Sequence, residues 1–316
     1  MIFKKLLIAE TLDFSDEVIE FLSTFLDVTI KDIDKQELNE VFRNYDYFWF
    51  RLKFRITEEL LNLSNRKVSV IITPVTGLDN INIIECNRLK IKVISLKGEI
   101  DFLKEIRATA EMTIALTLAL LRKLPQAIDS TKKFNWDRNL FKGSEIYRKK
   151  VGIIGMGRLG KIVAKYFDNF GAKVFAYDIK EYDFKLANKK NSLIELVSTC
   201  DIISLHVDYN TQNHHLINSK LLKLFKKGSV FINTSRGSLV DSNALIDSLN
   251  KGYLSGVGLD VIENEYNVSD NILIKYSQNN ENVIITPHIG GNTIESFKKT
   301  EMFIAKKLKE LTDKNV

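Results

Sequence analysis

Cysteine and histidine are scarce in this sequence. Its 316 residues include two cysteines, Cys86 and Cys200, and four histidines. These numbers exclude a disulfide framework and argue against a zinc site, so we expect free thiols and no bound metal. The N-terminal apolar run meets Glu10 too early for the core of a signal peptide, which predicts a cytoplasmic protein.

Long apolar runs and concentrated charge are also missing. The longest uncharged apolar run, residues 112–121, is far shorter than the roughly 20 residues of a membrane-spanning helix. The formal net charge is +6, but the lysines are scattered along the chain. We therefore expect neither a membrane nor a nucleic acid as partner. We interpret the positive charge as a solvated surface that attracts small anions.

The sequence does contain short apolar, strand-like runs that alternate with helical patterns from end to end. Such alternation is typical of an α/β fold with parallel sheets covered on both faces. Two series of strands are predicted. The first is residues 3–8, 28–30, 47–51, 68–72 and 93–96, and the second is residues 151–154, 173–177, 202–206, 229–233, 256–260 and 283–286. Six strands in the second series match the size of a complete dinucleotide-binding fold.

Helical patterns lie between the strands, for example at residues 17–25. A long helix is predicted over residues 102–122, and Pro125 is expected to end it. A polar connector that contains several aromatic residues follows over residues 132–148. A last helix is predicted over residues 293–311, with no strand after it.

A glycine-rich turn follows the first strand of the second series. Residues 155–160 read Gly-Met-Gly-Arg-Leu-Gly and open a predicted helix. Glycines at this spacing let backbone N–H groups approach the phosphates of a dinucleotide, and the helix N-terminus adds partial positive charge. Asp178 ends the next strand, where a carboxylate can bind both ribose hydroxyls and repel a 2′-phosphate. The pattern favours NAD over NADP, although Lys180 is a nearby cation that could attract a phosphate.

Polar residues also follow the later strands of the second series. Because the carboxyl ends of parallel strands meet at one edge of a sheet, we expect these residues to share a site. Arg236 follows the fourth strand, Glu265 the fifth and His288 the sixth. A histidine can exchange a proton near neutral pH, a carboxylate can orient its ring, and an arginine can bind a substrate carboxylate. The set indicates an oxidoreductase that moves a hydride between nicotinamide and C2 of a 2-hydroxy or 2-oxo acid.

Each of these residues also has an interpretation without chemistry. Arg236 could cap a turn, and His288 could be satisfied by backbone groups. Glu265 lies in the polar run ENEYN, where a solvated acid is common. The adjacent histidines 214–215 are interpreted as surface-loop residues, and His206 as structural or cofactor-contacting.

At these residues the sequence resembles the D-isomer-specific 2-hydroxyacid dehydrogenase family, and within it the phosphoglycerate dehydrogenase-like members. The resemblance covers nearly the whole chain, in the family's order. Its segments include TGLDNINI (76–83), VGIIGMGRLGK (151–161), INTSRGSLVD (232–241), GLDVIENE (258–265) and TPHIGGNT (286–293). It implies that Arg236, Glu265 and His288 are the catalytic residues and that Asp260 holds the nicotinamide carboxamide.

The resemblance also implies an architecture. A Rossmann NAD-binding domain, residues 103–287, is inserted into a flavodoxin-like substrate domain formed by residues 1–102 and 288–316. Both domains are expected to be doubly wound parallel sheets. Family members usually form homodimers through the NAD domain and the connector before it, so we expect residues 134–147 to pack on a partner subunit.

The expected binding residues follow from the glycine turn, the strand ends and the resemblance. For NAD they are Gly155, Gly157, Arg158, Leu159, Gly160, Asp178, His206, Val207, Thr211, Thr234, Ser235, Asp260 and Gly290. For the substrate they are Arg51, Thr76 and Gly77.

The resulting hypothesis is an NAD-dependent D-2-hydroxyacid dehydrogenase with a small 2-hydroxy or 2-oxo acid as substrate. Which acid is left open, because Arg51, Lys53 or Arg55 could bind a distal anionic group. Two alternatives remain. One is a relative of formate dehydrogenase, against which Glu265 argues because the formate enzymes use glutamine there. The other is an NAD-responsive binding protein similar to the family's corepressors.

Overall fold

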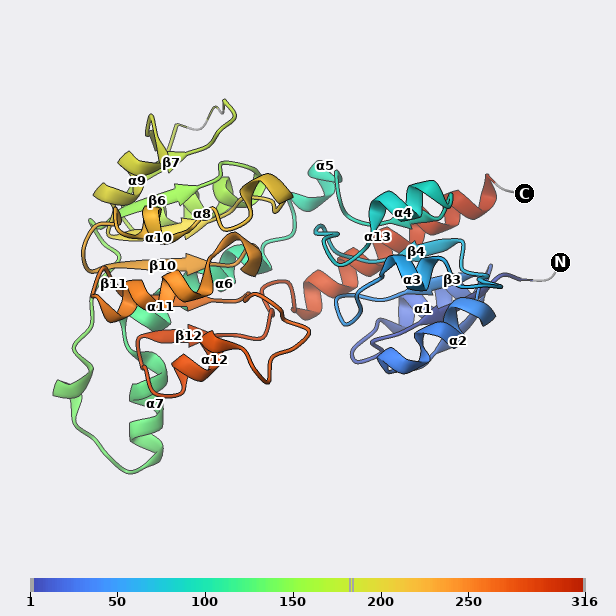
Figure 1. Ribbon diagram of the computed structural model, residues 1–316, viewed down its shortest axis with the longest axis horizontal. Helices are drawn as coiled ribbons and strands as arrows, with labels where there is room; N and C mark the ends of the chain where they lie inside the picture. Colours follow the sequence, from blue (N-terminus) through green and yellow to red (C-terminus); the bar gives the residue numbers. More distant parts are fainter. Residues whose placement is uncertain (1–2, 182, 184, 315–316) are drawn as a thin grey trace. The chain divides into compact units, whose positions relative to one another are not determined.

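The computed structural model describes residues 3–181, 183 and 185–314. The chain divides into two compact units, which are drawn in Figure 1. The first unit consists of Met1–Ile106 and Asn292–Val316, and the second of Arg107–Gly291. The sequence placed these divisions at residues 102/103 and 287/288.

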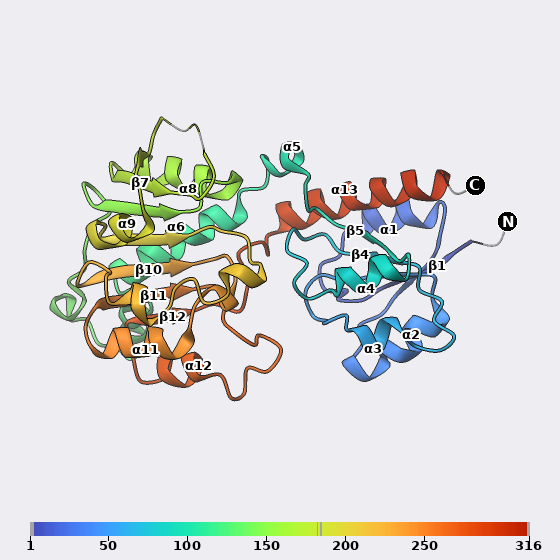
Figure 2. The same ribbon diagram turned by 45° about the horizontal axis from the view of Figure 1, so that its top comes forward.

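The first unit is built on a parallel sheet in the strand order β2-β1-β3-β4-β5. This is the order of the flavodoxin-like fold. Helices α1 and α13 cover one face, and α2, α3 and α4 cover the other (Figure 2). The strands are β1 (Lys5–Ile8), β2 (Asp27–Ile30), β3 (Tyr47–Trp49), β4 (Val70–Ile72) and β5 (Lys92–Ile94). The helices are α1 (Asp16–Ser23), η1 (Lys35–Glu37), α2 (Leu38–Asn44), α3 (Glu58–Leu61), α4 (Ile83–Arg88), α5 (Ile100–Leu103) and α13 (Ile294–Asp313).

Neighbouring residues of a strand point to opposite sides of the sheet, and in this sheet the residues on both sides are apolar. In β1, Leu7 packs with the helices of one face, whereas Leu6 and Ile8 pack against those of the other. The C-terminal helix α13 is amphipathic and buries Ile304 and Leu308 in the second of these cores. This packing makes the end of the chain part of the first unit.

The second unit is a larger parallel sheet in the order β12-β11-β10-β9-β6-β7-β8. The order reverses between β6 and β9, as in a Rossmann fold, and ligands bind such sheets at that reversal. The strands are β6 (Lys150–Ile154), β7 (Lys173–Tyr177), β8 (Asn188–Lys189), β9 (Ile202–Leu205), β10 (Ser229–Asn233), β11 (Leu254–Leu259) and β12 (Val283–Ile285).

Helices cover this sheet on both faces as well. Phe231 of β10 packs with the helices of one face, and its neighbours Val230 and Ile232 pack with those of the other. The first face carries α9 (Leu193–Thr199), α10 (Ser219–Leu222), α11 (Ser242–Asn250) and α12 (Ile272–Ser277), and the second carries α6 (Ala108–Leu121) and α8 (Arg158–Asn169). The remaining elements are α7 (Leu124–Lys132), η2 (Arg138–Phe141), η3 (Thr211–Asn213) and η4 (Gly237–Leu239).

The predicted α/β fold with two parallel sheets is confirmed. The count of six strands in the second series is wrong, because the described part of the chain adds β8 at the sheet edge. Its two residues, Asn188 and Lys189, are polar and exposed and give no apolar signal. In the described residues, no helix is both long enough and apolar enough to span a membrane.

The single helix predicted over residues 102–122 is also wrong. The structure has α5, then a tight turn, then α6. Leu103 packs in the core of the first unit and Ala110 in that of the second, so the two pieces belong to different units. Pro125 does not end α6 but lies in the first turn of α7, where its missing N–H costs no hydrogen bond.

Candidate active site

The glycine turn connects β6 to α8 in a tight backbone path. Gly155 has φ +95°, and a Cβ there would lie 2.5 Å from the carbonyl oxygen of His206. A Cβ on Gly160 would lie 1.9 Å from the carbonyl oxygen of Gly155. Side chains at these two positions are therefore excluded by the backbone of the turn and of β9.

Gly157 differs from the other two glycines because a Cβ there would meet no described atom within 4 Å. It is the N-cap of α8 and, as a glycine, has no side chain to cap that helix. The space beside this glycine is thus open at the start of the helix, at the reversal of the sheet. This is the arrangement that fits the pyrophosphate of a dinucleotide.

Asp178 follows β7, and its carboxylate is hydrogen-bonded to the same turn. Its Oδ2 accepts a hydrogen bond from the backbone N–H of Met156 at 2.7 Å, and its Oδ1 accepts one from that of Lys180 at 2.8 Å. The carboxylate is thereby fixed beside the glycines, where a ribose would lie. Arg158 and Leu159 are half-buried in the first turn of α8. Burial, and then the charge of Arg107, lowers the pKa of Arg158.

His206 lies at the end of β9, on the other side of the reversal. Its ring is buried, and Nε2 is 2.8 Å from the hydroxyl of Ser204. Nδ1 is buried with no hydrogen-bond partner among the described residues. Burial lowers the pKa of His206 to about 3, so the ring is neutral near pH 7. Val207 follows half-buried, and Thr211 is exposed at the start of η3.

His206 should make the fold sensitive to acid. Its pKa falls from 6.5 to about 3 on folding, so the unfolded chain accepts a proton that the folded chain refuses. The contribution of neutral His206 to the free energy of unfolding is complete above pH 6.5 and is lost as the pH falls toward 3. Between pH 7 and 4.5, the free energy of unfolding should fall by about 3 kcal/mol more in the wild type than in His206→Gln. Urea denaturation at the two pH values measures this, and equal losses would contradict it.

The clearest pair of titratable side chains is His288 with Glu265. Nδ1 of His288 lies 2.7 Å from Oε2 of Glu265. In the described part of the chain, this is the only hydrogen bond of the ring, so Nε2 remains for a substrate. The two side chains are 23% and 31% exposed, which keeps them accessible to a small molecule. A carboxylate on one nitrogen and an accessible second nitrogen is the arrangement of a general acid and base.

Asp260 holds the loop that carries His288. Its Oδ1 accepts hydrogen bonds from the Thr286 hydroxyl at 2.6 Å and from the Ile289 N–H at 2.9 Å. Its Oδ2 accepts one from the Gly290 N–H at 2.7 Å. The Asp260 carbonyl also accepts from the His288 N–H, and His288 adopts φ +54°. Asp260, which is 1% exposed, therefore fixes the backbone on both sides of the histidine.

Arg236 is placed at the same sheet edge as the pair. Strands β10, β11 and β12 are adjacent and parallel, with Asn233, Leu259 and Ile285 in register. Arg236 follows β10, is half-buried, and donates from Nη1 to the Ser235 carbonyl at 2.7 Å.

The segment around Arg236 is fixed by its neighbours. The Ser235 hydroxyl donates to the Leu205 carbonyl at 2.7 Å, and Nδ2 of Asn233 donates to the Arg236 carbonyl. The buried Thr234 hydroxyl is 2.9 Å from that of Thr113 in α6. These contacts hold the backbone on both sides of the arginine.

In the first unit, Arg51 is engaged in a buried ion pair. Its Nη2 lies 2.5 Å from Oε1 of Glu301, its Nη1 donates to the Leu12 carbonyl, and its guanidinium lies 4.0 Å from the Phe297 ring centre. The Arg51 side chain is 11% exposed and that of Glu301 is fully buried, and this burial raises the pKa of Glu301. The guanidinium thus anchors α13. Of the other residues expected at the substrate, Thr76 is exposed and Gly77 half-buried.

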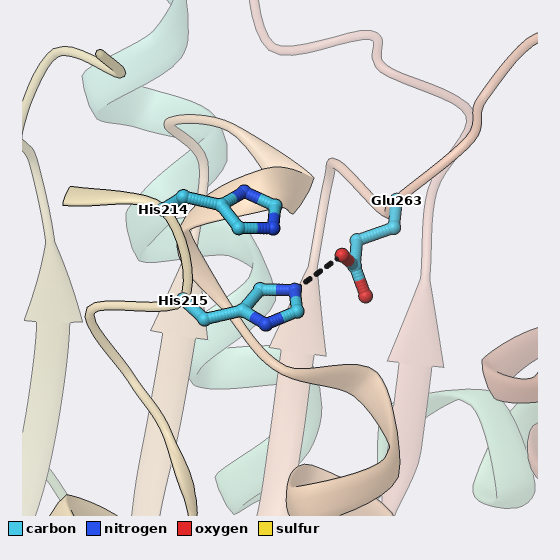
Figure 3. Close-up of side chains that lie close together, drawn as sticks. All are labelled: His214, His215 and Glu263. Atoms are coloured by element: carbon cyan, nitrogen blue, oxygen red, sulfur yellow. Dashed lines mark hydrogen bonds and ion pairs between the residues drawn. The ribbon is translucent and has the colours of Figure 1, made fainter. Parts of the chain in front are cut away.

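Glu263 was not predicted but connects three segments. Its Oε1 is 2.6 Å from Nε2 of His215, and its Oε2 accepts from the Ser242 hydroxyl at 2.5 Å. Figure 3 shows the glutamate with His215 and its neighbour His214. His215 lies in a loop, as expected, but its ring is half-buried and bonded. The one feature of the sequence that could have drawn attention to Glu263 was its position two residues before Glu265.

Several known proteins are similar to this chain. A family model described as the NAD-binding domain of D-isomer-specific 2-hydroxyacid dehydrogenases matches residues 114–290. Hydroxypyruvate reductase of Thermotoga maritima is 32% identical over 287 residues, which are 90% of this chain and 91% of that protein.

Two further similarities differ in how much of each protein they cover. D-3-phosphoglycerate dehydrogenase of Methanocaldococcus jannaschii is 32% identical over 88% of this chain, which spans only 52% of that protein. Among solved structures, D-lactate dehydrogenase from Aquifex aeolicus in complex with NAD and lactic acid superposes with a TM-score of 0.79. It is 31% identical, and the match covers 98% of this chain and 95% of the other.

Proposed function

Because the chain belongs to the D-isomer-specific 2-hydroxyacid dehydrogenase family and carries its NAD-binding domain, we propose that it interconverts a D-2-hydroxy acid and its 2-oxo acid. Bound NAD would accept or supply the hydride at C2 of the acid. The observation that carries the proposal is the His288–Glu265 pair at 2.7 Å, which lies with Arg236 at the carboxyl edge of the same parallel sheet.

Each of the three side chains has a role in the proposed reaction. Arg236 binds the substrate carboxylate through its planar fork of N–H donors. In the direction of reduction, Nε2 of His288 donates a proton to the oxygen on C2, and in oxidation it removes that proton. Glu265 orients the ring through Nδ1.

The dinucleotide is proposed to lie along the glycine turn. Gly155, Gly157 and Gly160 admit the pyrophosphate, and Asp178 binds the ribose hydroxyls and disfavours NADP. Arg158, Leu159, His206, Val207, Thr211, Thr234, Ser235 and Gly290 complete the proposed contacts. The open space at Gly157 and the fixed carboxylate of Asp178 support this assignment. Substrate binding by Arg51, Thr76 and Gly77 remains a prediction, and Glu301 already pairs with the first of them.

The reaction and the cofactor preference are tested together. Purified protein is assayed with NADH and with NADPH on a panel of 2-oxo acids that includes glyoxylate, pyruvate, hydroxypyruvate and 3-phosphohydroxypyruvate. We expect turnover of at least one acid, with higher kcat/KM for NADH than for NADPH. Equal efficiency with both would refute the role of Asp178. Tight NADH binding without turnover of any acid would favour a binding protein instead.

We also propose a homodimer formed through α7 and the connector that follows. Figure 1 shows this segment extending away from the sheet of its unit. It exposes large apolar side chains: Phe134 is 100% exposed, Trp136 89%, Leu140 55% and Ile128 50%. Apolar side chains gathered in this way mark an interaction surface.

A dimer predicts a mass of two chains by light scattering at micromolar concentration. Replacing both Phe134 and Trp136 with serine should shift the protein to the monomer, because the two rings are the most exposed large apolar side chains of the segment. Leu12→Ser, at an exposed apolar residue of the first unit, is the control and should stay dimeric. A monomeric wild type would refute the proposal.

A further inference from the structure

We propose that His214, His215 and Glu263 form a binding site for one divalent cation of the zinc type. The site lies in the second unit and is separate from the His288–Glu265 pair, and it does not depend on the proposed function. Each residue offers one ligand atom, and these atoms all lie within 4.8 Å of one another. In the described part of the chain, no other group of three such side chains has this spacing.

The backbone brings the two neighbouring rings to the same side. Successive side chains of an extended chain point in opposite directions. His215 instead adopts φ +52°, a left-handed conformation, and its ring stacks on that of His214 with 3.9 Å between ring centres. The His215 N–H donates to the Ser238 carbonyl, which holds this turn in place. Figure 3 shows both rings beside the carboxylate.

One nitrogen of each histidine ring, His214 and His215, already contacts a different partner. Nδ1 of His214 is 3.4 Å from the Tyr209 hydroxyl, which leaves its Nε2 for a cation. Nε2 of His215 lies 2.6 Å from Oε1 of Glu263. The other carboxylate oxygen is held by the Ser242 hydroxyl at 2.5 Å, so the carboxylate is oriented by a second partner. Metal ligands in proteins are commonly oriented in this way.

The side chains must rearrange to admit a zinc ion. With metal–ligand distances of roughly 2.0–2.2 Å, tetrahedral ligand atoms lie about 3.3 Å apart, so the His215–Glu263 bond must open by less than an ångström. A metal ion lies in the plane of each imidazole that binds it, so the exposed ring of His214 must leave its stack on His215 by turning about its side-chain bonds. The proton between His215 and Glu263 leaves as the cation binds. Water would take the fourth position.

The donor set and its surroundings select the class of cation. Two imidazole nitrogens and one carboxylate oxygen suit zinc and its neighbours, whereas magnesium and calcium prefer oxygen ligands alone. The thiols do not compete, because Cys86 and Cys200 are fully buried and burial raises the pKa of each to about 11. His206 is also buried.

A cation at this site would tie the loop after β9 to the turn after β11. That turn is formed by residues 263–266, and Glu263 begins it. A ligand that binds only the folded chain raises its stability by mass action. Zinc should therefore raise the melting temperature of the wild type, and removal of a ligand side chain should abolish the rise.

The test is calorimetric titration of metal-free full-length protein with zinc chloride at pH 7.5, together with thermal melting. We expect one zinc ion per chain at this site, and at least tenfold weaker binding in His214→Ala and in Glu263→Gln. His214 is exposed, so its replacement should leave the fold intact, as the melting temperature without zinc will show. His288→Asn is the matched control, because it removes a histidine beside the other glutamate and should keep the zinc affinity.

Three results would overturn the proposal. The first is no zinc binding by the wild type at 100-fold molar excess. The second is a His214→Ala variant that binds zinc as tightly as the wild type and gains the same melting temperature. The third is loss of the binding event in His288→Asn, which would place the cation on the His288–Glu265 pair.

Discussion

Replacing His288 with asparagine should lower kcat for reduction of the 2-oxo acid by roughly 10²–10⁴-fold, the usual contribution of a positioned general acid. Asparagine has a similar size and keeps a polar contact to Glu265, but it carries no transferable proton. The NADH dissociation constant should change less than threefold, because the glycine turn and Asp178 lie at other strand ends. Steady-state kinetics and NADH fluorescence titration measure the two quantities.

Glu265→Gln separates proton transfer from the placement of the ring. Glutamine can keep the contact to Nδ1 of His288 but removes the negative charge beside the imidazole. The ring changes its charge when it delivers a proton, so kcat for reduction should fall, whereas the NADH dissociation constant should stay close to that of the wild type. A wild-type kcat in Glu265→Gln, or a His288→Asn enzyme near the wild-type rate, would show that another group delivers the proton.

The fold was predictable from the sequence because its strands are buried on both faces. Runs such as residues 151–154 and 230–232 contain no polar side chain, and between two layers of helices this is the expected composition of a central strand. The apolar pattern did not predict β8, whose residues are exposed. It also predicted one helix where the structure has α5 and α6, because these two helices are buried in the cores of different units.

The candidate site was predictable to the extent that strand ends define it. Arg236, Glu265 and His288 each follow a strand of the same parallel sheet, so one rule placed all three at one edge. Contacts between distant loops have no such rule. Glu301 is 250 positions from Arg51 in the chain, and Glu263 is 48 positions from His215. Neither the ion pair that anchors α13 nor the His215–Glu263 hydrogen bond could therefore be derived from local sequence.

Gly157 and Gly160, at the N-terminus of α8, should differ in how much alanine lowers the free energy of unfolding. In Gly160→Ala the new methyl group would lie 1.9 Å from the carbonyl oxygen of Gly155, so backbone must move. We expect the free energy of unfolding to fall by about 1–3 kcal/mol, as in other overpacked sites. NADH binding should weaken as well, because the displaced turn carries the N–H groups that we propose to meet the pyrophosphate.

Gly157→Ala is the matched variant, since it adds the same methyl group where no described atom lies within 4 Å. Its backbone has φ −65°, which alanine adopts without strain, so urea denaturation should show a change within about 1 kcal/mol. The methyl group nevertheless enters the space assigned to the pyrophosphate, and NADH affinity should fall at least tenfold. Because this variant folds like the wild type, its loss of affinity cannot arise from a damaged turn. Wild-type NADH affinity in Gly157→Ala would mean that the dinucleotide does not approach the backbone at this glycine.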